Sequence, residues 1–355
     1  MKNLREPLIF GAVIVVLAIV AAISLWKRPD ASFQVLEHRP QAVMGTATRL
    51  LVVPPPGDVP RGEATLSSAE RELRRVEALM SVRLDISEIS RLNQAAAGDF
   101  VPLSTDSVAV LMAARQAHDA THGAFDVTLG PLIKLWREGA VNGVEPAAER
   151  LQAARDSSKW SLLQIRDDGA VKAGDGLQVD LGGIAKGYAI DRGIAAMRNL
   201  GMRGGVVDVG GDVRAFGTFD GERGWPVDIL DPFSPDGRLG RFSLRDKAVC
   251  TSGDYARTIK IRGAKFSHII DPRSLRPAAF VPSVSVIADT AMEADAWATA
   301  MSVLGPEEGF ALLPPELDAL MVVGTEGDYR VLATEGFARY LTERPAHLEV
   351  IERAP

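Results

Sequence analysis

The feature that most constrains the fold is the long middle part of the chain, residues 160–289, where short β-favouring runs are broken by glycine, aspartate and proline. Only one clear helical segment, residues 187–200, interrupts these runs. Regular alternation of strands and helices would indicate a parallel, doubly wound sheet, and that alternation is absent. The sequence therefore predicts an α+β fold with mixed or antiparallel sheets and flanking helices. The candidate strands span residues 161–166, 177–181, 205–209, 225–230, 240–244, 247–251, 256–262, 266–270 and 283–288.

Helices are expected on either side of this region from the spacing of apolar residues. Ser67 and Glu70 form a capping-box pattern ahead of an amphipathic run that ends near Met80. The other expected helices span residues 106–118, 145–155 and 290–304.

Composition excludes several classes of protein. The 355 residues are 46% hydrophobic, which is ample for a large core. Forty basic and 46 acidic residues give a net charge of −6 without long runs of either sign, so no nucleic-acid partner is expected. The single cysteine, Cys250, excludes disulfides within the chain and zinc knuckles.

The N-terminal region contains an uninterrupted uncharged stretch, residues 8–26, flanked by basic residues on both sides. This length spans a bilayer, and no convincing cleavage site follows it. We expect a single anchor in the inner (cytoplasmic) membrane with the body in the periplasm; secretion to the periplasm after cleavage of an export signal is the alternative. The predicted organisation is an anchor or uncleaved signal over 1–29, a polar stalk over 30–43, a body over 44–343 and a tail over 344–355.

Residues 179–191 (VDLGGIAKGYAID) bring an acid, two glycines, a lysine and a helix start together. Glycine lets the backbone approach a ligand closely, and a helix N-terminus attracts anions, so the stretch suits a phosphate. Asp180 can accept hydrogen bonds from a ribose or base, or hold a metal, and Lys186 supplies a positive charge. The spacing fits neither the Walker nor the Rossmann pattern. An ordinary turn with a solvated lysine is the alternative.

A second group lies on the expected helix over 290–304. Asp295 and Thr299 are four residues apart and share one face. A carboxylate and a hydroxyl are the hard oxygen ligands that Mg²⁺ takes beside phosphate oxygens and water. The alternative is that Thr299 bonds to its own helix and Asp295 is exposed.

Further candidates follow strands. Asp208 and Asp212 flank a glycine pair at a strand end, where a tight turn alone is the alternative. His268 and Asp271 suit a general base or a phosphate contact, although a strand histidine is more often structural. Ser252 lacks the setting of a serine nucleophile.

In their order, these segments resemble the ApbE family of flavin transferases, also called FAD:protein FMN transferases. The resemblance covers roughly residues 44–304 and implies an α+β body with FAD bound in a cleft, exported or anchored outside the cytoplasm. The matching segments are residues 44–46, 87–93, 123–126, 180–187, 210–212, 251–253, 268–272 and 293–299.

The resemblance also implies roles for individual residues. Asp295 and Thr299 correspond to Mg²⁺ ligands, and the backbone carbonyl of Gly183 completes the protein's share. Two positions depart from the family pattern: Arg83 stands where an aromatic residue is often found over the flavin, and Ala298 stands where many members carry a serine. The positions that correspond to flavin contacts are Met44, Ala124, Phe125, Asp126, Asp180, Lys186 and Ile270.

The activity implied is Mg²⁺-dependent transfer of FMN from FAD to a threonine or serine hydroxyl of an acceptor protein, with release of AMP. The implied acceptor is a subunit of a membrane electron-transfer complex. Lys186 is expected to hold phosphate oxygens, and His268 or Asp271 to take the hydroxyl proton. Two alternatives stay open: a Mg²⁺-dependent FAD pyrophosphatase, and a non-catalytic, membrane-anchored FAD-binding protein.

Overall fold

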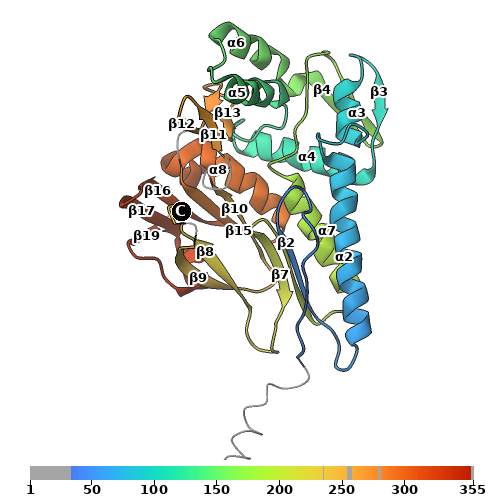
Figure 1. The fold of residues 1–355 in the computed structure, drawn as a ribbon, viewed down its shortest axis with the longest axis vertical. Coiled ribbons are helices and arrows are strands. Elements are labelled where there is room, and N and C mark those ends of the chain that lie inside the picture. The colour runs from blue at the N-terminus through green and yellow to red at the C-terminus, as the bar shows by residue number, and fades with distance from the viewer. Residues whose placement is uncertain (1–32, 235, 254–257, 279–280, 353–355) are drawn as a thin grey trace, which may run out of the picture.

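The computed structural model describes residues 33–352 except 235, 254–257 and 279–280 (Figure 1). The predicted anchor, residues 8–26, lies outside the described residues. Within the described part of the chain, no helix is both long enough and apolar enough to cross a membrane.

A nine-stranded sheet forms the centre of the molecule, in the order β1-β2-β6-β7-β10-β15-β16-β17-β19. Neighbouring strands run antiparallel, except for β17 and β19, which are parallel. The predicted α+β class with mixed and antiparallel sheets is therefore confirmed. The strands are β1 (Leu36–His38), β2 (Thr48–Val53), β6 (Gly204–Val209), β7 (Asp212–Gly217), β10 (Ala248–Gly253), β15 (Ser283–Ala288), β16 (Asp318–Thr325), β17 (Asp328–Thr334) and β19 (Leu348–Ile351).

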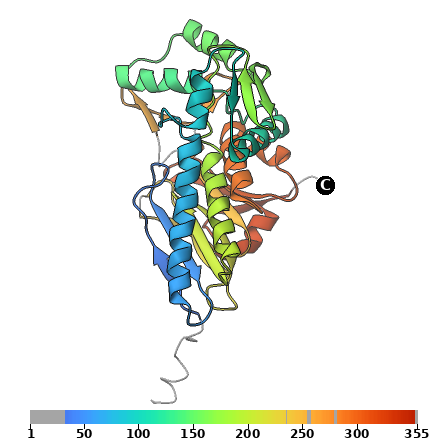
Figure 2. The same ribbon diagram turned by 90° about the vertical axis from the view of Figure 1, so that its right-hand side faces the viewer.

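Three helices cover one face of this sheet: α2 (Val59–Met80), α7 (Ala185–Asn199) and α8 (Ala291–Leu312). Figure 2 shows α2 and α7 running side by side in front of the strands. The first part of α8 is apolar on nearly every side, as expected for a helix buried on all sides. Its helical path breaks at Gly305, where φ is 74° and ψ is −175°, directly before Pro306.

The opposite face of the central sheet is covered by a smaller sheet of β8 (Trp225–Leu230), β9 (Arg238–Leu244) and β18 (Leu341–Glu343). The short helix α9 (Glu335–Tyr340) packs beside it. Phe242 and Phe337 meet edge to face at 5.8 Å in the apolar layer between the two sheets. The central sheet is thus buried on both faces.

A second group of elements lies at one end of the sheet (Figure 1). An apolar cluster in this group joins α5 (Gly130–Asn142) and α6 (Ala148–Ser157) to the short strands β11 (Thr258–Ile261) and β13 (Ile270–Asp271) through residues such as Trp136 and Ile270. The elements of this group are α3 (Glu88–Gln94), β3 (Phe100–Pro102), α4 (Thr105–Ala120), α5 (Gly130–Asn142), α6 (Ala148–Ser157), β4 (Leu163–Arg166), β5 (Gly169–Lys172), β11 (Thr258–Ile261), β12 (Ala264–Ser267), β13 (Ile270–Asp271) and β14 (Arg276–Pro277), with a 3₁₀ turn at Trp160–Leu162.

Two local predictions were wrong. The capping box at Ser67 does not begin a helix: α2 already begins after Asp58, whose side chain accepts a hydrogen bond from the backbone N–H of Arg61. Ser67 lies inside the helix, where its hydroxyl donates to the carbonyl of Glu63. Residues 177–181 form no strand and contribute only an isolated bridge at Gln178.

The folded body also extends past both predicted boundaries. The segment predicted as a stalk contains β1, which pairs with β2 at the edge of the central sheet. The segment predicted as a tail contains β19, which pairs with β17 at the other edge.

Candidate active site

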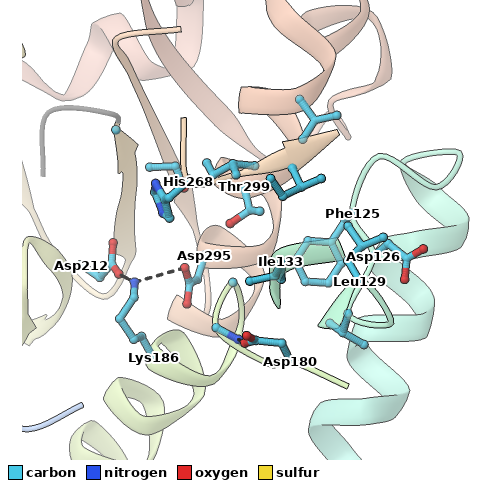
Figure 3. A pocket seen from close by; sticks show the side chains of 18 of the residues that line it. Phe125, Asp126, Leu129, Ile133, Asp180, Lys186, Asp212, His268, Asp295 and Thr299 are labelled. Atoms are coloured by element: carbon cyan, nitrogen blue, oxygen red, sulfur yellow. Dashed lines mark hydrogen bonds and ion pairs between the residues drawn. The ribbon is translucent and has the colours of Figure 1, made fainter. Parts of the chain in front are cut away.

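A pocket opens where the second group of elements, at the end of the central sheet, meets that sheet and α8 (Figure 3). It is lined by α8, the loop before α7, the loop before α5, the turn between β6 and β7, the end of β10 and the link from β12 to β13. The residues predicted for the site that line this pocket are Ala124, Phe125, Asp126, Asp180, Gly183, Lys186, His268, Ile270, Asp295 and Thr299.

Two predicted residues are not among those that line the pocket. Met44 has a φ of 53° and packs, partly buried, against the main core. The Asp271 carboxylate accepts hydrogen bonds from the backbone N–H and the Nε of Arg273, at 2.8 and 3.2 Å. Since Asp271 serves the turn between β13 and β14, His268 is the predicted proton acceptor that lies at the pocket.

The Asp126 carboxylate turns away from the pocket (Figure 3). It accepts hydrogen bonds from the backbone N–H and the hydroxyl of Thr128, at 2.8 and 2.7 Å, and lies 3.6 Å from Arg155. Burial raises the pKa of Asp126, while the bonds from Thr128 oppose the rise. These contacts fix the loop that places the Phe125 ring against the pocket.

Lys186 lies in the first turn of α7, between two acids (Figure 3). Its Nζ donates to the carboxylate of Asp212 and, at 3.4 Å, to Oδ1 of Asp295. Burial opposes the charged amine, but the two carboxylates outweigh this effect and raise the pKa of Lys186. Lys186 is therefore a paired cation, and the solvated-lysine alternative is wrong.

Asp295 is 3% exposed and accepts a 3.0 Å hydrogen bond from the backbone N–H of Gly187. Burial raises its pKa to about 6, with Lys186 opposing the rise and Asp212 adding to it. A buried carboxylate that shares one lysine with a second acid is electrostatically suited to bind another cation. The alternative in which Asp295 is exposed is therefore wrong.

The backbone of Gly183 lies directly beside Thr299. A Cβ added to Gly183 would lie 3.0 Å from Thr299 Oγ1 and 3.2 Å from the Phe125 ring. Thr299 stands one helical turn after Asp295 on α8, and all three residues line the pocket. The Asp295 carboxylate, the Thr299 hydroxyl and the Gly183 backbone thus lie at one wall of the pocket.

This donor set fits Mg²⁺. The described residues contain no cluster of three or more histidine, cysteine, aspartate or glutamate side chains placed to hold a metal. Mg²⁺ binds proteins through one or two carboxylates and completes its octahedron with water and phosphate oxygens. A wall with one carboxylate and two neutral oxygens suits an ion that is shared with a phosphate-bearing ligand.

Gly187 serves helix packing. A Cβ at Gly187 would lie 2.2 Å from the carbonyl oxygen of Ala291, so the two helices touch through their backbones at this point. The N–H of Gly187 donates to the Asp295 carboxylate and is not offered to a bound phosphate. Gly182 and Gly183 line the pocket, and the N–H of Gly182 is likewise bonded to a carboxylate, that of Asp180, at 2.9 Å.

Sequence reasoning missed Arg137, which lines the pocket from α5. Its guanidinium lies 3.8 Å from the Asp180 carboxylate, and its side chain is 63% exposed. No local motif marks Arg137, because its place at the pocket depends on how α5 packs above the loop before α7.

Comparison with known proteins shows which family this chain resembles. A sequence model of the ApbE family matches residues 44–322. The FAD:protein FMN transferase of Vibrio cholerae is 32% identical over 312 residues, covering 86% of this chain and 93% of that protein. The FAD:protein FMN transferase of Treponema pallidum is 32% identical over 335 residues, covering 86% and 91%.

Solved structures show the same fold. The flavin transferase ApbE from Vibrio cholerae matches with a TM-score of 0.76 at 30% identity, covering 87% of this chain and 100% of that chain. The apo form of the Pseudomonas stutzeri flavinyl transferase ApbE matches with a TM-score of 0.77 at 30% identity, covering 87% and 97%.

Proposed function

This chain belongs to the ApbE family, and from that premise we propose that it transfers FMN from FAD to a threonine or serine hydroxyl of an acceptor protein, in a Mg²⁺-dependent reaction that releases AMP. The observation that carries this proposal is the meeting of Asp295, Thr299 and the Gly183 backbone at one wall of the pocket, next to Lys186. Oxygen ligands for a hard cation are what phosphoryl-group chemistry requires.

Asp295, Thr299 and the carbonyl of Gly183 would hold Mg²⁺. When bound, the ion supplies positive charge to the phosphate oxygens of FAD. The buried pair with Lys186 favours the ionised form of Asp295, which is the form that binds a cation. Lys186 donates to both Asp212 and Asp295, and we place its contribution in holding these two carboxylates rather than in direct contact with a phosphate.

His268 is the residue that we propose to accept the proton of the acceptor hydroxyl. The hydroxyl oxygen forms a bond to the phosphorus of the FMN half of FAD, the bond from that phosphorus to the bridging oxygen breaks, and AMP leaves. Histidine suits this task because its ordinary pKa lies near neutrality. In Figure 3, His268 and Thr299 lie on the same side of Asp295. The proposed proton acceptor and the proposed Mg²⁺ ligands therefore line the same pocket.

Intact-mass spectrometry of an acceptor protein tests the proposal. The full chain, solubilised in detergent, is incubated with FAD, Mg²⁺ and a flavin-acceptor domain, with and without chelator. A chelator-sensitive gain of one FMN less water supports the transferase. Release of AMP and free FMN without a modified acceptor would instead favour a pyrophosphatase, and bound, unchanged FAD would favour a carrier.

We also propose that residues 8–26 anchor the chain in the inner membrane, with the body in the periplasm. The support is the uncharged stretch itself, which is long enough to span a bilayer. Extraction of membranes with alkaline carbonate tests this proposal: an anchored chain stays with the lipid, and its release into the supernatant would contradict the anchor.

A further inference from the structure

We infer that Arg137 on α5 binds the diphosphate of FAD, and that its guanidinium leaves Asp180 to do so. This inference rests on the proposed function, because it names a contact to the substrate of that reaction. It adds a cationic side chain to the proposed Mg²⁺ ligands.

The charges that line the pocket create the need for such a contact. Four aspartates line it, against one lysine and one arginine. The carboxylate of Asp126 turns away and lies 3.6 Å from Arg155, so a basic residue of α6 already balances it. The other three aspartates still outnumber the lysine and the arginine. A diphosphate is negatively charged, and an acidic excess repels it unless cations offset that excess.

Lys186 is already paired on two sides. Its Nζ donates to the carboxylate of Asp212 and, at 3.4 Å, to that of Asp295. A lysine shared by two buried acids has no positive charge in excess of theirs to offer to a ligand. Among the described residues that line the pocket, Arg137 is the one other lysine or arginine.

The pairing of Arg137 with Asp180 is loose. Nη2 of Arg137 lies 3.8 Å from Oδ2 of Asp180, which is longer than a hydrogen bond, and the Arg137 side chain is 63% exposed. An exposed ion pair of this kind contributes little to stability, so the guanidinium can leave its partner for a ligand. Asp180 then keeps the 2.9 Å hydrogen bond from the N–H of Gly182.

Arg137 lies near the proposed Mg²⁺ ligands. It pairs with Asp180 at one end of the loop over residues 180–183, and Gly183 at the other end lies beside Thr299. Arg137 and the proposed ligands thus meet the same short loop. Because Mg²⁺ takes phosphate oxygens as ligands, a diphosphate bound to the ion would lie beside this loop, where a long arginine side chain can reach it.

The chemistry of the guanidinium favours a phosphate. Its planar donors form two parallel hydrogen bonds to two phosphate oxygens. Arginine also stacks on aromatic rings, so the adenine and the flavin ring of FAD are competing partners. Stacking on a neutral ring would leave the acidic excess of the pocket facing the diphosphate, whereas a phosphate contact offsets it.

Binding of FAD, ADP and adenosine tests the inference, with the full chain in detergent and Mg²⁺ present. ADP carries a diphosphate on the same adenosine that FAD contains, and adenosine has no phosphate. Arg137→Gln is expected to raise the Kd for FAD and for ADP roughly tenfold and to leave the Kd for adenosine unchanged. Flavin fluorescence gives the Kd for FAD, and isothermal titration calorimetry gives the other two.

Lys134→Gln is the matched control. Lys134 is an exposed cation on the same helix, and it lines a second cavity, between α3 and α5, rather than the pocket. Its loss should change each Kd by less than about twofold, because salt screens an exposed charge that makes no contact with the ligand. Arg137→Lys keeps the charge without the planar donors and should recover part of the affinity for FAD and ADP.

Four results would overturn the inference. Equal increases in the Kd for ADP and adenosine in Arg137→Gln would place the contact at the adenosine, and an increase for FAD alone would place it at the flavin half. Equal increases in Arg137→Gln and Lys134→Gln would reduce the effect to the general charge of α5. No recovery in Arg137→Lys would indicate stacking on a ring. If adenosine binds too weakly to measure, the other three comparisons decide.

The same measurements separate the inference from the function on which it rests. If the wild-type chain binds FAD but modifies no acceptor, the transferase falls, while the Kd values still decide the role of Arg137. If the wild type binds neither FAD nor ADP, both proposals fall.

Discussion

The carboxylate of Asp191 on α7 accepts a 2.8 Å hydrogen bond from the backbone N–H of Ala291, at the first turn of α8. It also accepts a bond from the N–H of Met292 at 3.0 Å and one from Arg214 on β7 at 2.6 Å. An acid at a helix N-terminus satisfies amides that otherwise lack partners. One half-buried side chain thus joins α7, α8 and the central sheet, and it fixes the two helices that line the pocket relative to each other.

Asp191→Ala is expected to lower the free energy of unfolding by about 3 kcal/mol, because it leaves the Arg214 guanidinium and two helix amides without their acceptor in a buried setting. Asp191→Asn keeps an oxygen acceptor and should cost less. Urea denaturation measures both. Arg339→Ala, which removes an ion pair whose side chains are each 72% exposed, is the control and should change stability by less than about 0.5 kcal/mol. Equal losses of stability in Asp191→Ala and Arg339→Ala would contradict the role of Asp191 in joining α7, α8 and the central sheet.

Gly183→Ala and Gly187→Ala should show that Gly183 serves activity, whereas Gly187 serves the packing of α7 against α8. At Gly187 the new methyl meets the backbone of Ala291 at 2.2 Å, which forces α7 and α8 apart and should cost about 3 kcal/mol of stability. At Gly183 it meets the Thr299 and Phe125 side chains at 3.0 to 3.2 Å, so activity should fall more than stability does. Thermal denaturation beside an FMN-transfer assay checks both. The same thermal loss in the two variants would refute the distinction.

The sequence was sufficient for the fold class and for several parts of the site, because these depend on local patterns. Short β-favouring runs with one helix among them indicate α+β, and the four-residue spacing of Asp295 and Thr299 defines one helical face whatever surrounds it. The start of α2 was misplaced because Ser67 offers a local capping pattern, whereas the cap at Asp58 followed by Pro60 begins the helix earlier.

The partners of the site residues could not be predicted. Lys186 is paired with Asp212 and Asp295, which lie 26 and 109 residues further along the chain. Such pairs depend on which strands and helices become neighbours, and no local pattern encodes that. The same holds for Gly187. Its place in residues 179–191 predicted a phosphate contact, whereas in the structure it packs against the backbone of α8.

A cluster of charges between α2, α4 and α7 should give the protein an acid-sensitive contribution to stability. Hydrogen bonds from Arg75 lower the pKa of Asp106 below its ordinary value of 3.8; burial opposes the shift, and a 2.5 Å bond from the Tyr188 hydroxyl adds to it. A carboxyl with a lowered pKa in the folded state stabilises the fold above pH 3.8, and this contribution is lost as the pH falls below that value.

Asp106→Asn is therefore expected to be less stable than the wild type at pH 7, and the difference should shrink as the pH falls below 3.8. Urea denaturation across pH 2 to 7 measures the difference. Asp119→Asn, at an exposed ion pair on the same helix, is the control and should show little change at any pH. A difference between Asp106→Asn and wild type that stays constant over the whole range would exclude the charge as its cause.

The proposed Mg²⁺ ligands predict how FAD binding depends on Mg²⁺. If Asp295 and Thr299 hold the ion beside the phosphates, the wild-type affinity for FAD should rise with Mg²⁺ concentration, and Asp295→Asn should remove this dependence and lower turnover by more than roughly 10-fold. Lys186 keeps its bond to Asp212 in that variant, so the fold should persist. Quenching of flavin fluorescence at several Mg²⁺ concentrations gives the affinities.

Thr299 allows a finer test on the same helix. Thr299→Val keeps the shape of the side chain but removes the hydroxyl, whereas Thr299→Ser keeps the hydroxyl. We expect the Mg²⁺ dependence of FAD binding to weaken in the valine variant and to survive in the serine variant. Ser302→Ala is the control, because Ser302 is buried and its hydroxyl donates to the carbonyl of Ala298 in its own helix. If Thr299→Val behaves like Ser302→Ala, the hydroxyl is not a ligand, and the wall reduces to Asp295 and the Gly183 carbonyl.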